Sequence, residues 1–245
     1  MNTLKHIFSN PRLTQRINPM RKLLLTTAAV AAAIAGAVAG ETAFGTFTDT
    51  RDGQTYKTVK IGKQTWMAQN INYKTPSGSW CYDNADSNCV KYGRLYDWNA
   101  AMTACPAGYH LASQKDWENL GNTVGGKMRV YHPPMEDWVG AGISLKAKHG
   151  WNSCKNQCGN GTDNFGFSAL PGGNRDSIGN FNGAGSYGRW WANTRLYDFG
   201  VGKGGVWWID CTERHNCDVV TFYYGHADAV EQDGGFSVRC VADRP

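Results

Sequence analysis

The apolar and polar positions between residues 46 and 71 alternate in three short runs. Such alternation places successive side chains on opposite faces, which is typical of β-strands with one buried face. Turn signals stand between the runs, with Asp52-Gly53 after the first and Gly62-Lys63 after the second. The sequence therefore predicts a small antiparallel meander whose strands are residues 46–50, 56–61 and 64–71.

Helical spacing replaces this alternation further along the chain. Between residues 94 and 104, the side chains of Leu95, Trp98 and Met102 fall on one face of a helix. Pro106 follows this run and cannot continue a helix, because it has no backbone N–H to donate. The pattern predicts a helix over residues 94–104.

A second helix is predicted to begin after Ser113. The Ser113 side chain is suited to cap the first turn, and Asp116 stands where a capping box requires its acceptor. The predicted buried stripe of this helix is Trp117, Leu120 and Val124, and the pair Gly125-Gly126 ends it.

Beyond residue 126 the helical period disappears. Segments rich in glycine, asparagine and aspartate separate five short runs with the composition of strands. These runs are residues 165–170, 190–194, 205–210, 219–224 and 235–241. Residues 171–188 are rich in glycine and are expected to be mostly coil. The order of strands, two helices and an irregular β-rich half predicts an α+β fold with small antiparallel sheets and long Gly/Asn-rich loops.

Residues 1–39 have the composition of a leader. Met20-Arg21-Lys22 precedes an apolar run over residues 23–38, which closes on the small-x-small pattern Ala37-Val38-Ala39 that signal peptidase recognises. We interpret the segment as a signal peptide whose translation start is Met20. This leaves residues 40–245 as a single domain without a membrane span, secreted or held at the cell surface. Retention of the apolar run as an uncleaved anchor is the alternative.

The cysteines and the charge of the chain support export and exclude one class of function. All eight cysteines follow residue 39, and an even number behind a signal peptide predicts disulfides formed in an oxidising compartment. The leader holds five of the 25 Lys and Arg residues and no acidic residue, so residues 40–245 carry equal numbers of basic and acidic groups. Together with the lack of a basic run, this balance excludes a nucleic-acid-binding protein.

The tryptophans point to a binding face. Sugars present apolar C–H faces ringed by hydroxyls, so flat rings beside polar side chains suit them. Adjacent side chains of a strand point to opposite faces, so the pairs Trp190-Trp191 and Trp207-Trp208 must each direct one ring toward a second surface. That surface is either another packed layer of the core or a ligand. We predict a ligand-binding face within residues 171–226, formed by Arg175, Tyr187, Trp191, Asn193 and Trp208.

Metal binding and catalysis have weaker support in the sequence. Two short loops carry several oxygen-bearing side chains, as a calcium site requires. They hold Asp83, Asn84, Asp86 and Asn88 in one loop, and Asn160, Asp163 and Asn164 in the other. Because these residue types also form ordinary turns, we predict no cofactor and keep a structural calcium ion as the alternative. No spacing selects a pair of catalytic carboxylates or a zinc-binding group of histidines, so we favour binding over catalysis.

Six strings of the sequence, taken in order along the chain, carry a resemblance to a known family. They are TVKIGKQTWMAQN (residues 58–70), YGRLY (92–96), CPAGYHL (105–111), GFSALPGG (166–173), Trp190-Trp191 and SVRCV (237–241). Together they resemble the Fibrobacter succinogenes major paralogous domain over about residues 47–243. That family is similar in pattern to the C-type-lectin-like fold, which it shares with formylglycine-generating enzymes. The resemblance implies an exported bacterial domain of this fold, and family membership alone assigns no reaction.

The cysteine spacing predicts four disulfides. Close neighbours pair as Cys81–Cys89, Cys154–Cys158 and Cys211–Cys217, which leaves Cys105–Cys240 as a long bridge. The resemblance implies the same long bridge, from the end of a helix to the last strand. We therefore expect an exported, non-catalytic domain that binds polysaccharide or another cell-surface component. An enzyme of the formylglycine-generating type and a structural subunit of a surface appendage or matrix are the alternatives.

Overall fold

The computed structural model describes residues 43–132, 135–153, 159–198, 201–210, 218–223 and 233–243. All of them belong to the unit Ala39–Pro245. The predicted leader and four of the cysteines (Cys154, Cys158, Cys211 and Cys217) lie outside the described residues. The described part combines helices with small antiparallel sheets, which confirms the predicted α+β class.

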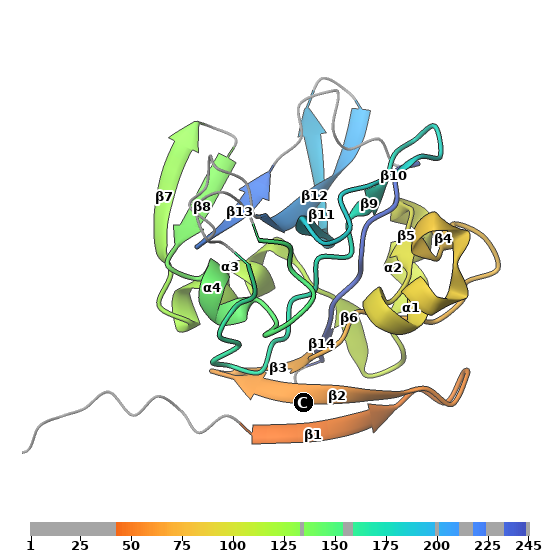
Figure 1. Cartoon of the computed structure of the whole chain (residues 1–245), viewed down its shortest axis with the longest axis horizontal. Helices are drawn as coiled ribbons and strands as arrows, with labels where there is room; N and C mark the ends of the chain where they lie inside the picture. Colours follow the sequence, from red (N-terminus) through yellow and green to blue (C-terminus); the bar gives the residue numbers. More distant parts are fainter. Residues whose placement is uncertain are drawn as a thin grey trace, which may run out of the picture. The chain divides into compact units, whose positions relative to one another are not determined.

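The first sheet contains the meander predicted from the sequence. Strands β1 (Ala43–Thr48), β2 (Thr55–Ile61) and β3 (Gln64–Met67) pair in succession, although β3 ends at Met67 and not at residue 71. The strands β14 (Cys240–Ala242) and β6 (Tyr109–Leu111) complete the sheet in the order β1-β2-β3-β14-β6. The last strand of the chain therefore pairs with β3 and with a strand that follows α2 (Figure 1).

The second sheet has the order β11-β12-β13-β8-β7. Its strands are β11 (Tyr187–Asp198), β12 (Val201–Asp210), β13 (Val219–Tyr223), β8 (Met135–Val139) and β7 (Lys127–His132). The predicted runs 190–194, 205–210 and 219–224 fall on the first three strands, whereas β7 and β8 were not predicted. Two predictions were wrong: residues 165–170 form no strand, and within 235–241 only the start of β14 is one.

Two pairs of short strands lie beside the second sheet. One pair is β4 (Ser79–Trp80) with β5 (Leu95–Tyr96), and the other is β9 (Asn174–Arg175) with β10 (Phe181–Asn182). The second pair falls within residues 171–188, which the sequence predicted as mostly coil. Both pairs lie on the right of Figure 1, near helix α1 (Asp86–Tyr92).

Helix α3 (Gln114–Thr123) forms as predicted, with a Ser113–Asp116 capping box and buried Trp117, Leu120 and Val124. Helix α2 (Trp98–Ala104) is shorter than predicted, because the Asp97 side chain caps it and the preceding residues form β5. The α2 side chain of Met102 is 43% exposed, so it is not part of the buried face.

Three helical elements were not predicted. They are α1, the 3-10 turn η1 (Tyr82–Asn84) that precedes it, and α4 (Gly142–Leu145).

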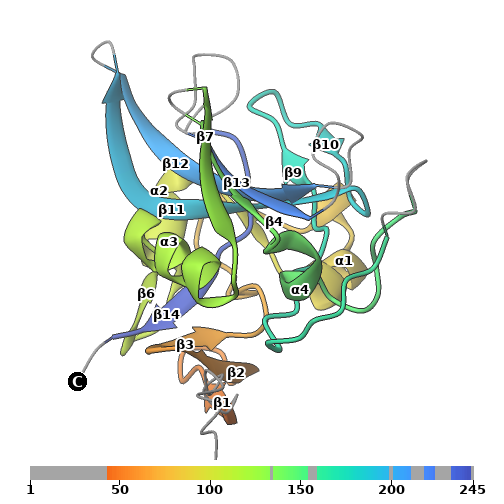
Figure 2. The ribbon, with the colours of Figure 1, turned by 90° about the vertical axis from the view of Figure 1, so that its left-hand side faces the viewer.

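The long strand β11 lies between two apolar cores. On one face, Trp190 packs with Trp117 of α3, at 5.9 Å between ring centroids. On the other face, Trp191 packs edge-on against Trp98 of α2 at 5.2 Å and against Phe236 at 4.6 Å. Figure 2 shows α2 and α3 beside β11 and β12. Both tryptophans have no exposed surface, so the second surface that strand alternation requires is here another packed layer.

A buried arginine joins the first sheet to residues 167–168. Arg239 is 0% exposed and donates four hydrogen bonds, to the Asn70 side chain at 2.7 Å and to the carbonyl oxygens of Met67 (3.0 Å), Phe167 (2.7 Å) and Ser168 (2.9 Å). Its guanidinium also lies over the Phe167 ring, at 4.4 Å. Burial lowers the pKa of Arg239 to about 9, so the group is charged at neutral pH.

Asn70 extends this network to the second sheet. Its Oδ1 accepts from the Trp190 indole at 2.8 Å, and its Nδ2 donates to the Tyr92 carbonyl at 2.7 Å and to the Ser237 hydroxyl at 3.3 Å. Buried polar groups need such partners, because an unpaired one costs about 1–3 kcal/mol. The network therefore ties β3, β11 and the ends of α1 and β14 to one another.

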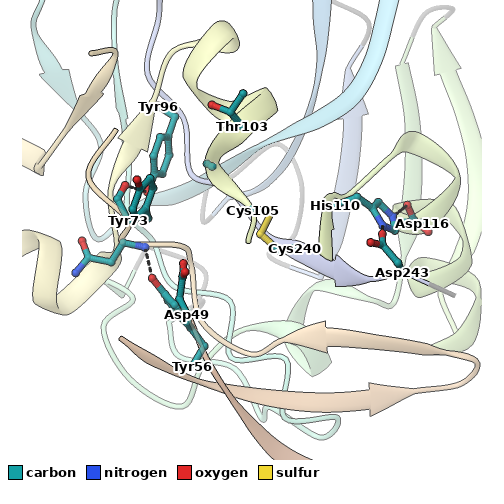
Figure 3. Close-up of a disulfide and its surroundings, with 12 residues drawn as sticks. Asp49, Tyr56, Tyr73, Tyr96, Thr103, Cys105, His110, Asp116, Cys240 and Asp243 are labelled. Atoms are coloured by element: carbon teal, nitrogen blue, oxygen red, sulfur yellow. Dashed lines mark hydrogen bonds and ion pairs between the residues drawn. A yellow bond between two sulfur atoms is a disulfide. The ribbon is translucent and has the colours of Figure 1, made fainter. Parts of the chain in front are cut away.

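Two of the predicted disulfides lie within the described residues. Cys81–Cys89 closes the loop around η1 and α1, and Cys105–Cys240 joins the end of α2 to β14, across 135 residues of sequence. Figure 3 shows the second bridge with Tyr96 on one side and His110, with its two carboxylate partners, on the other. In the chain-entropy account, a loop of this length contributes about 4–5 kcal/mol to stability.

His110 connects α3 to the end of the chain near this bridge. One ring nitrogen lies 3.1 Å from Asp116 Oδ2, and the other lies 2.8 Å from Asp243 Oδ1. Burial by itself would raise the pKa of Asp116. Hydrogen bonds from the Ser113 side chain and backbone, and then from His110, outweigh burial and hold this pKa below its usual range.

We predict that Arg239→Met lowers the free energy of unfolding by at least about 3 kcal/mol. Three buried carbonyl oxygens lose their donor, and relief of the buried charge offsets only part of that loss. Urea unfolding of the disulfide-bonded protein measures the difference. The control Lys63→Met changes an exposed turn residue and should stay within about 0.5 kcal/mol of the parent protein. A loss below about 1 kcal/mol for Arg239→Met would contradict this role.

We also predict that protonation of Asp116 contributes to the loss of stability in acid. Its pKa is lower in the folded than in the unfolded chain, where it is about 3.9. Its stabilising contribution is therefore complete above about pH 4 and is lost as the pH falls through the folded-state pKa. Urea unfolding at pH 7 and pH 3 should show a smaller pH-dependent loss in Asp116→Asn than in the parent. Equal losses in the two proteins would refute this assignment.

Candidate functional site

The structure separates the five residues predicted to bind a ligand. Arg175, Tyr187 and Trp208 are half-buried. They do not belong to the second core, the buried cluster that contains Trp191 and Phe236. Trp191 has no exposed surface, so its prediction as a stacking residue was wrong. It points to the same face of β11 as Arg189 but packs beneath Phe236 and against α2.

Asn193 is exposed, but it is displaced from the others. It follows Trp191 on β11 at a bulge between Ala192 and Arg195, where the register with β12 shifts. Its backbone N–H donates to the Ala112 carbonyl at 2.8 Å, which fixes the bulge against the end of β6. The buried Trp191 therefore separates Asn193 from Arg189 along the strand.

Arg189 stands at the centre of the half-buried group on the second sheet. Residues Tyr187 and Arg189 share one face of β11, and Trp208 is the cross-strand partner of Arg189 on β12. The Arg189 Cζ atom lies 4.5 Å from the Tyr187 ring centroid, 5.4 Å from that of Trp208 and 6.0 Å from that of Phe236. The Tyr187 hydroxyl in turn donates to Asn174 Oδ1 on β9, at 2.8 Å.

A second arginine makes the same kind of contact on the neighbouring strands. The Arg175 Cζ atom lies 4.2 Å from the ring centroid of Trp80 on β4. The backbone of Arg175 exchanges two hydrogen bonds with Gly235, at 2.9 and 2.8 Å. Gly235 precedes Phe236, which reaches Arg189, so the segment 235–236 links the two arginines. We call Trp80, Arg175, Tyr187, Arg189 and Trp208 the arginine–aromatic surface.

Glycines allow the chain to lie close to the rings of this surface. A Cβ atom on Gly183, whose φ is +75°, would collide with the Tyr187 ring. A Cβ atom on Gly235 would lie 3.1 Å from Arg175 Cβ and 3.4 Å from a ring atom of Trp80. These positions need glycine because the backbone approaches the side chains that hold the arginines.

Electrostatics favour a cationic surface. Burial raises the pKa of Tyr187, and the charge of Arg189 opposes this change only in part, so the phenol is neutral at physiological pH. Arginine keeps its charge throughout the physiological range. A positively charged guanidinium over an aromatic face is attracted to the negative face of the ring, by about 0.5–1 kcal/mol at exposed sites.

Sequence reasoning missed Trp80 and did not single out Arg189 as a contact residue. Trp80 is far from Arg175 in the chain, and only the pairing of β4 with β5 and of Arg175 with Gly235 brings the two together. The aromatic pair Tyr82 and Phe181, at 5.4 Å between centroids, flanks the same region and was also missed. For Arg189, the available signal was its place directly before the predicted run 190–194, within the predicted binding region 171–226.

A polar pocket of about 230 Å³ lies elsewhere, between β2, the segment after β3 and the end of α1. Gln54 Oε1 accepts from Asn72 Nδ2 at 3.0 Å, and the Asn72 backbone N–H donates to the Tyr56 hydroxyl at 3.0 Å. The lining groups thus bind one another and hold the loop that follows β3. We assign no ligand to this pocket.

Three of the seven side chains suggested for calcium form hydrogen bonds to other protein groups. Asp163 accepts from the Ser168 backbone and hydroxyl at 2.7 and 2.6 Å, Asn160 accepts from the Trp151 backbone at 3.0 Å, and Asn88 donates to the Tyr82 carbonyl at 2.9 Å. Within the described residues, no three His, Cys, Asp or Glu side chains are grouped as metal ligands.

Comparison with protein families matches residues 59–242 to the Fibrobacter succinogenes major domain, and the chain belongs to this family. The match confirms the resemblance of the six strings. No curated protein and no solved structure matches the chain. In the part of the chain that the structure describes, no helix is both long and apolar enough to cross a membrane.

We predict different effects for two tryptophans that the sequence treated alike. Trp191→Ala removes a fully buried ring and should destabilise the protein by roughly 3–5 kcal/mol. Trp208→Ala removes a half-buried ring and should cost less than about 2 kcal/mol. Thermal and urea unfolding of both variants will measure this difference. Similar losses would mean that Trp208 belongs to the core as fully as Trp191.

Proposed function

We propose that this protein is an exported, non-catalytic binding domain whose ligand is a polysaccharide of a cell surface or matrix. The observation that carries the proposal is the arginine–aromatic surface. Five half-buried side chains with flat or planar groups come from β4, β9, β11 and β12 and form two arginine–aromatic contact groups, which residues 235–236 connect. Binding sites on rigid strands hold such groups in place before the ligand arrives, which lowers the entropy lost on binding.

Export supports this function. The Cys81–Cys89 and Cys105–Cys240 bridges are compatible with folding in an oxidising compartment. We infer that residues 1–39 direct the chain there as a signal peptide and that the mature domain is secreted or displayed at the cell surface. Edman sequencing or mass spectrometry of the exported protein identifies its N-terminus.

We also infer that the fold is C-type-lectin-like. The Cys105–Cys240 bridge supports this inference, since it connects the end of a helix to the last strand, as the family resemblance implies. The long irregular connection between the helical part and β14 is in accord with it, because it carries β9 to β13 and four of the five residues of the arginine–aromatic surface, all except Trp80. The fold alone assigns no ligand, and the surface has to be tested directly.

We predict that the disulfide-bonded protein is retained on an insoluble or immobilised polysaccharide and that Trp208→Ala weakens retention at least about threefold. The loss follows from the ring's contact with Arg189 and its half-buried position on β12. Phe44→Ala is the matched control, because it removes a ring that is 70% exposed on β1 of the first sheet. The panel contains cellulose, xylan, chitin, polygalacturonate and a sulfated glucan.

Retention of the parent and of Phe44→Ala, with loss in Trp208→Ala, supports the binding function. Absence of retention on every polymer rejects it and favours the structural or enzymatic alternatives. A thiol titration of the native protein helps to separate those two. The four described cysteines are all disulfide-bonded, so any reactive thiol has to come from the cysteines outside the described residues.

A further inference from the structure

Two of the three aromatic rings of the arginine–aromatic surface, those of Trp80 and Tyr187, are already in contact with protein groups. Arg175 lies over the Trp80 ring, and the Gly235 backbone approaches the same ring. Arg189 lies over the Tyr187 ring, which also packs against Gly183. A neutral sugar that stacks through its C–H face needs an open ring face. These two rings therefore support arginines more readily than they stack on sugar.

The stacked arrangement leaves the hydrogen-bonding edge of a guanidinium available. All five N–H donors of arginine lie in the plane of the group, so a contact through its flat face does not use them. Arg175 is also held from another side, because Gly179 lies close enough that an added Cβ would be 3.0 Å from Arg175 Nη2. A fixed planar donor of this kind fits the two oxygens of a carboxylate or a sulfate in a bidentate contact.

Arg175 has no ionic partner among the described residues. The ion pairs found there involve Arg51, His110, Lys115 and Arg129 as the basic groups. The one hydrogen bond from the Arg175 guanidinium is a long contact of 3.4 Å to the Asp176 carbonyl. The neighbouring Asp176 carboxylate accepts instead from Asn180 and Asn182 within its own turn.

From these contacts we propose that the ligand is an anionic polysaccharide and that Arg175 binds its acidic groups. The inference rests on the function proposed above and narrows its ligand class. Residues 40–245 have no net charge at neutral pH, so the chain as a whole gives no general attraction to a polyanion. Selectivity for an acidic polymer then depends on the local charge of Arg175.

The acidic group has two chemical sources in polysaccharides, the carboxylate of a uronic acid and a sulfate ester. Both present oxygens to the same guanidinium edge. Polygalacturonate supplies the carboxylate arm of the experiment, a sulfated glucan supplies the sulfate arm, and the unmodified glucan is the neutral reference. The ratio of the two affinities identifies the source.

The test measures affinity of the disulfide-bonded protein for each polymer by affinity electrophoresis or interferometry, at low and high NaCl. We expect binding to one acidic polymer at least about tenfold tighter than to the neutral glucan, and weaker binding at high salt. Arg175→Gln should lose at least about tenfold toward the acidic polymer, because it removes a charge-assisted hydrogen-bonding group. Arg175→Lys keeps the charge but loses the bidentate fork, so its affinity for the acidic polymer should lie between those of the parent and of Arg175→Gln.

Lys63→Gln is the matched control, since it removes one positive charge from an exposed turn of the first sheet and should bind like the parent. Circular dichroism and the unfolding midpoint confirm that Arg175→Gln is folded. Equal or tighter binding to neutral polymers, unchanged in Arg175→Gln, would overturn the inference and leave the proposed function intact. No binding to any polymer would overturn both.

Discussion

The buried guanidinium of Arg239 is the interaction on which the arrangement of this protein depends. It places a full positive charge in the interior, and four hydrogen bonds to oxygen atoms of two separate segments offset the cost of burying it. The acceptors come from β3 and its following turn, and from residues 167–168. Because a planar group with fixed donor directions accepts few arrangements, it selects one relative position for these segments, which apolar packing alone leaves less defined.

This network also accounts for the family motifs. Asn70 belongs to the first string, Phe167 and Ser168 to the fourth, Trp190 to the fifth and Arg239 to the last, and they meet in one hydrogen-bonded cluster. The strings that mark the family, whose match covers residues 59–242, thus supply the residues of one structural hydrogen-bond network. The arginine–aromatic surface lies outside that centre: of its five residues, none belongs to the six strings. The family scaffold and the arginine–aromatic surface are therefore built from separate residues of this chain.

The two parts are nevertheless mechanically connected through β11. The bond from Trp190 to Asn70 fixes one face of the strand toward the first core, and alternation then sends Trp191 and Arg189 to the other face. Trp191 packs inside the second core against Phe236. Arg189 lies on the same face of β11 and also contacts the Phe236 ring. The hydrogen bond from Trp190 to Asn70, on the opposite face of β11, therefore helps to fix the position of Arg189.

The sequence by itself determined the elements whose signals are local. The meander, the capping box of α3 and its buried stripe, and the Cys81–Cys89 pair depend on neighbours within about ten residues, and all were predicted correctly. Strand alternation also required two opposed surfaces for Trp190 and Trp191. Only the tertiary structure decided that both surfaces are cores, that Trp80 meets Arg175, and that Arg239 is buried. These contacts join distant segments, and their choice depends on packing and hydrogen-bond satisfaction across the whole domain, which no local pattern encodes.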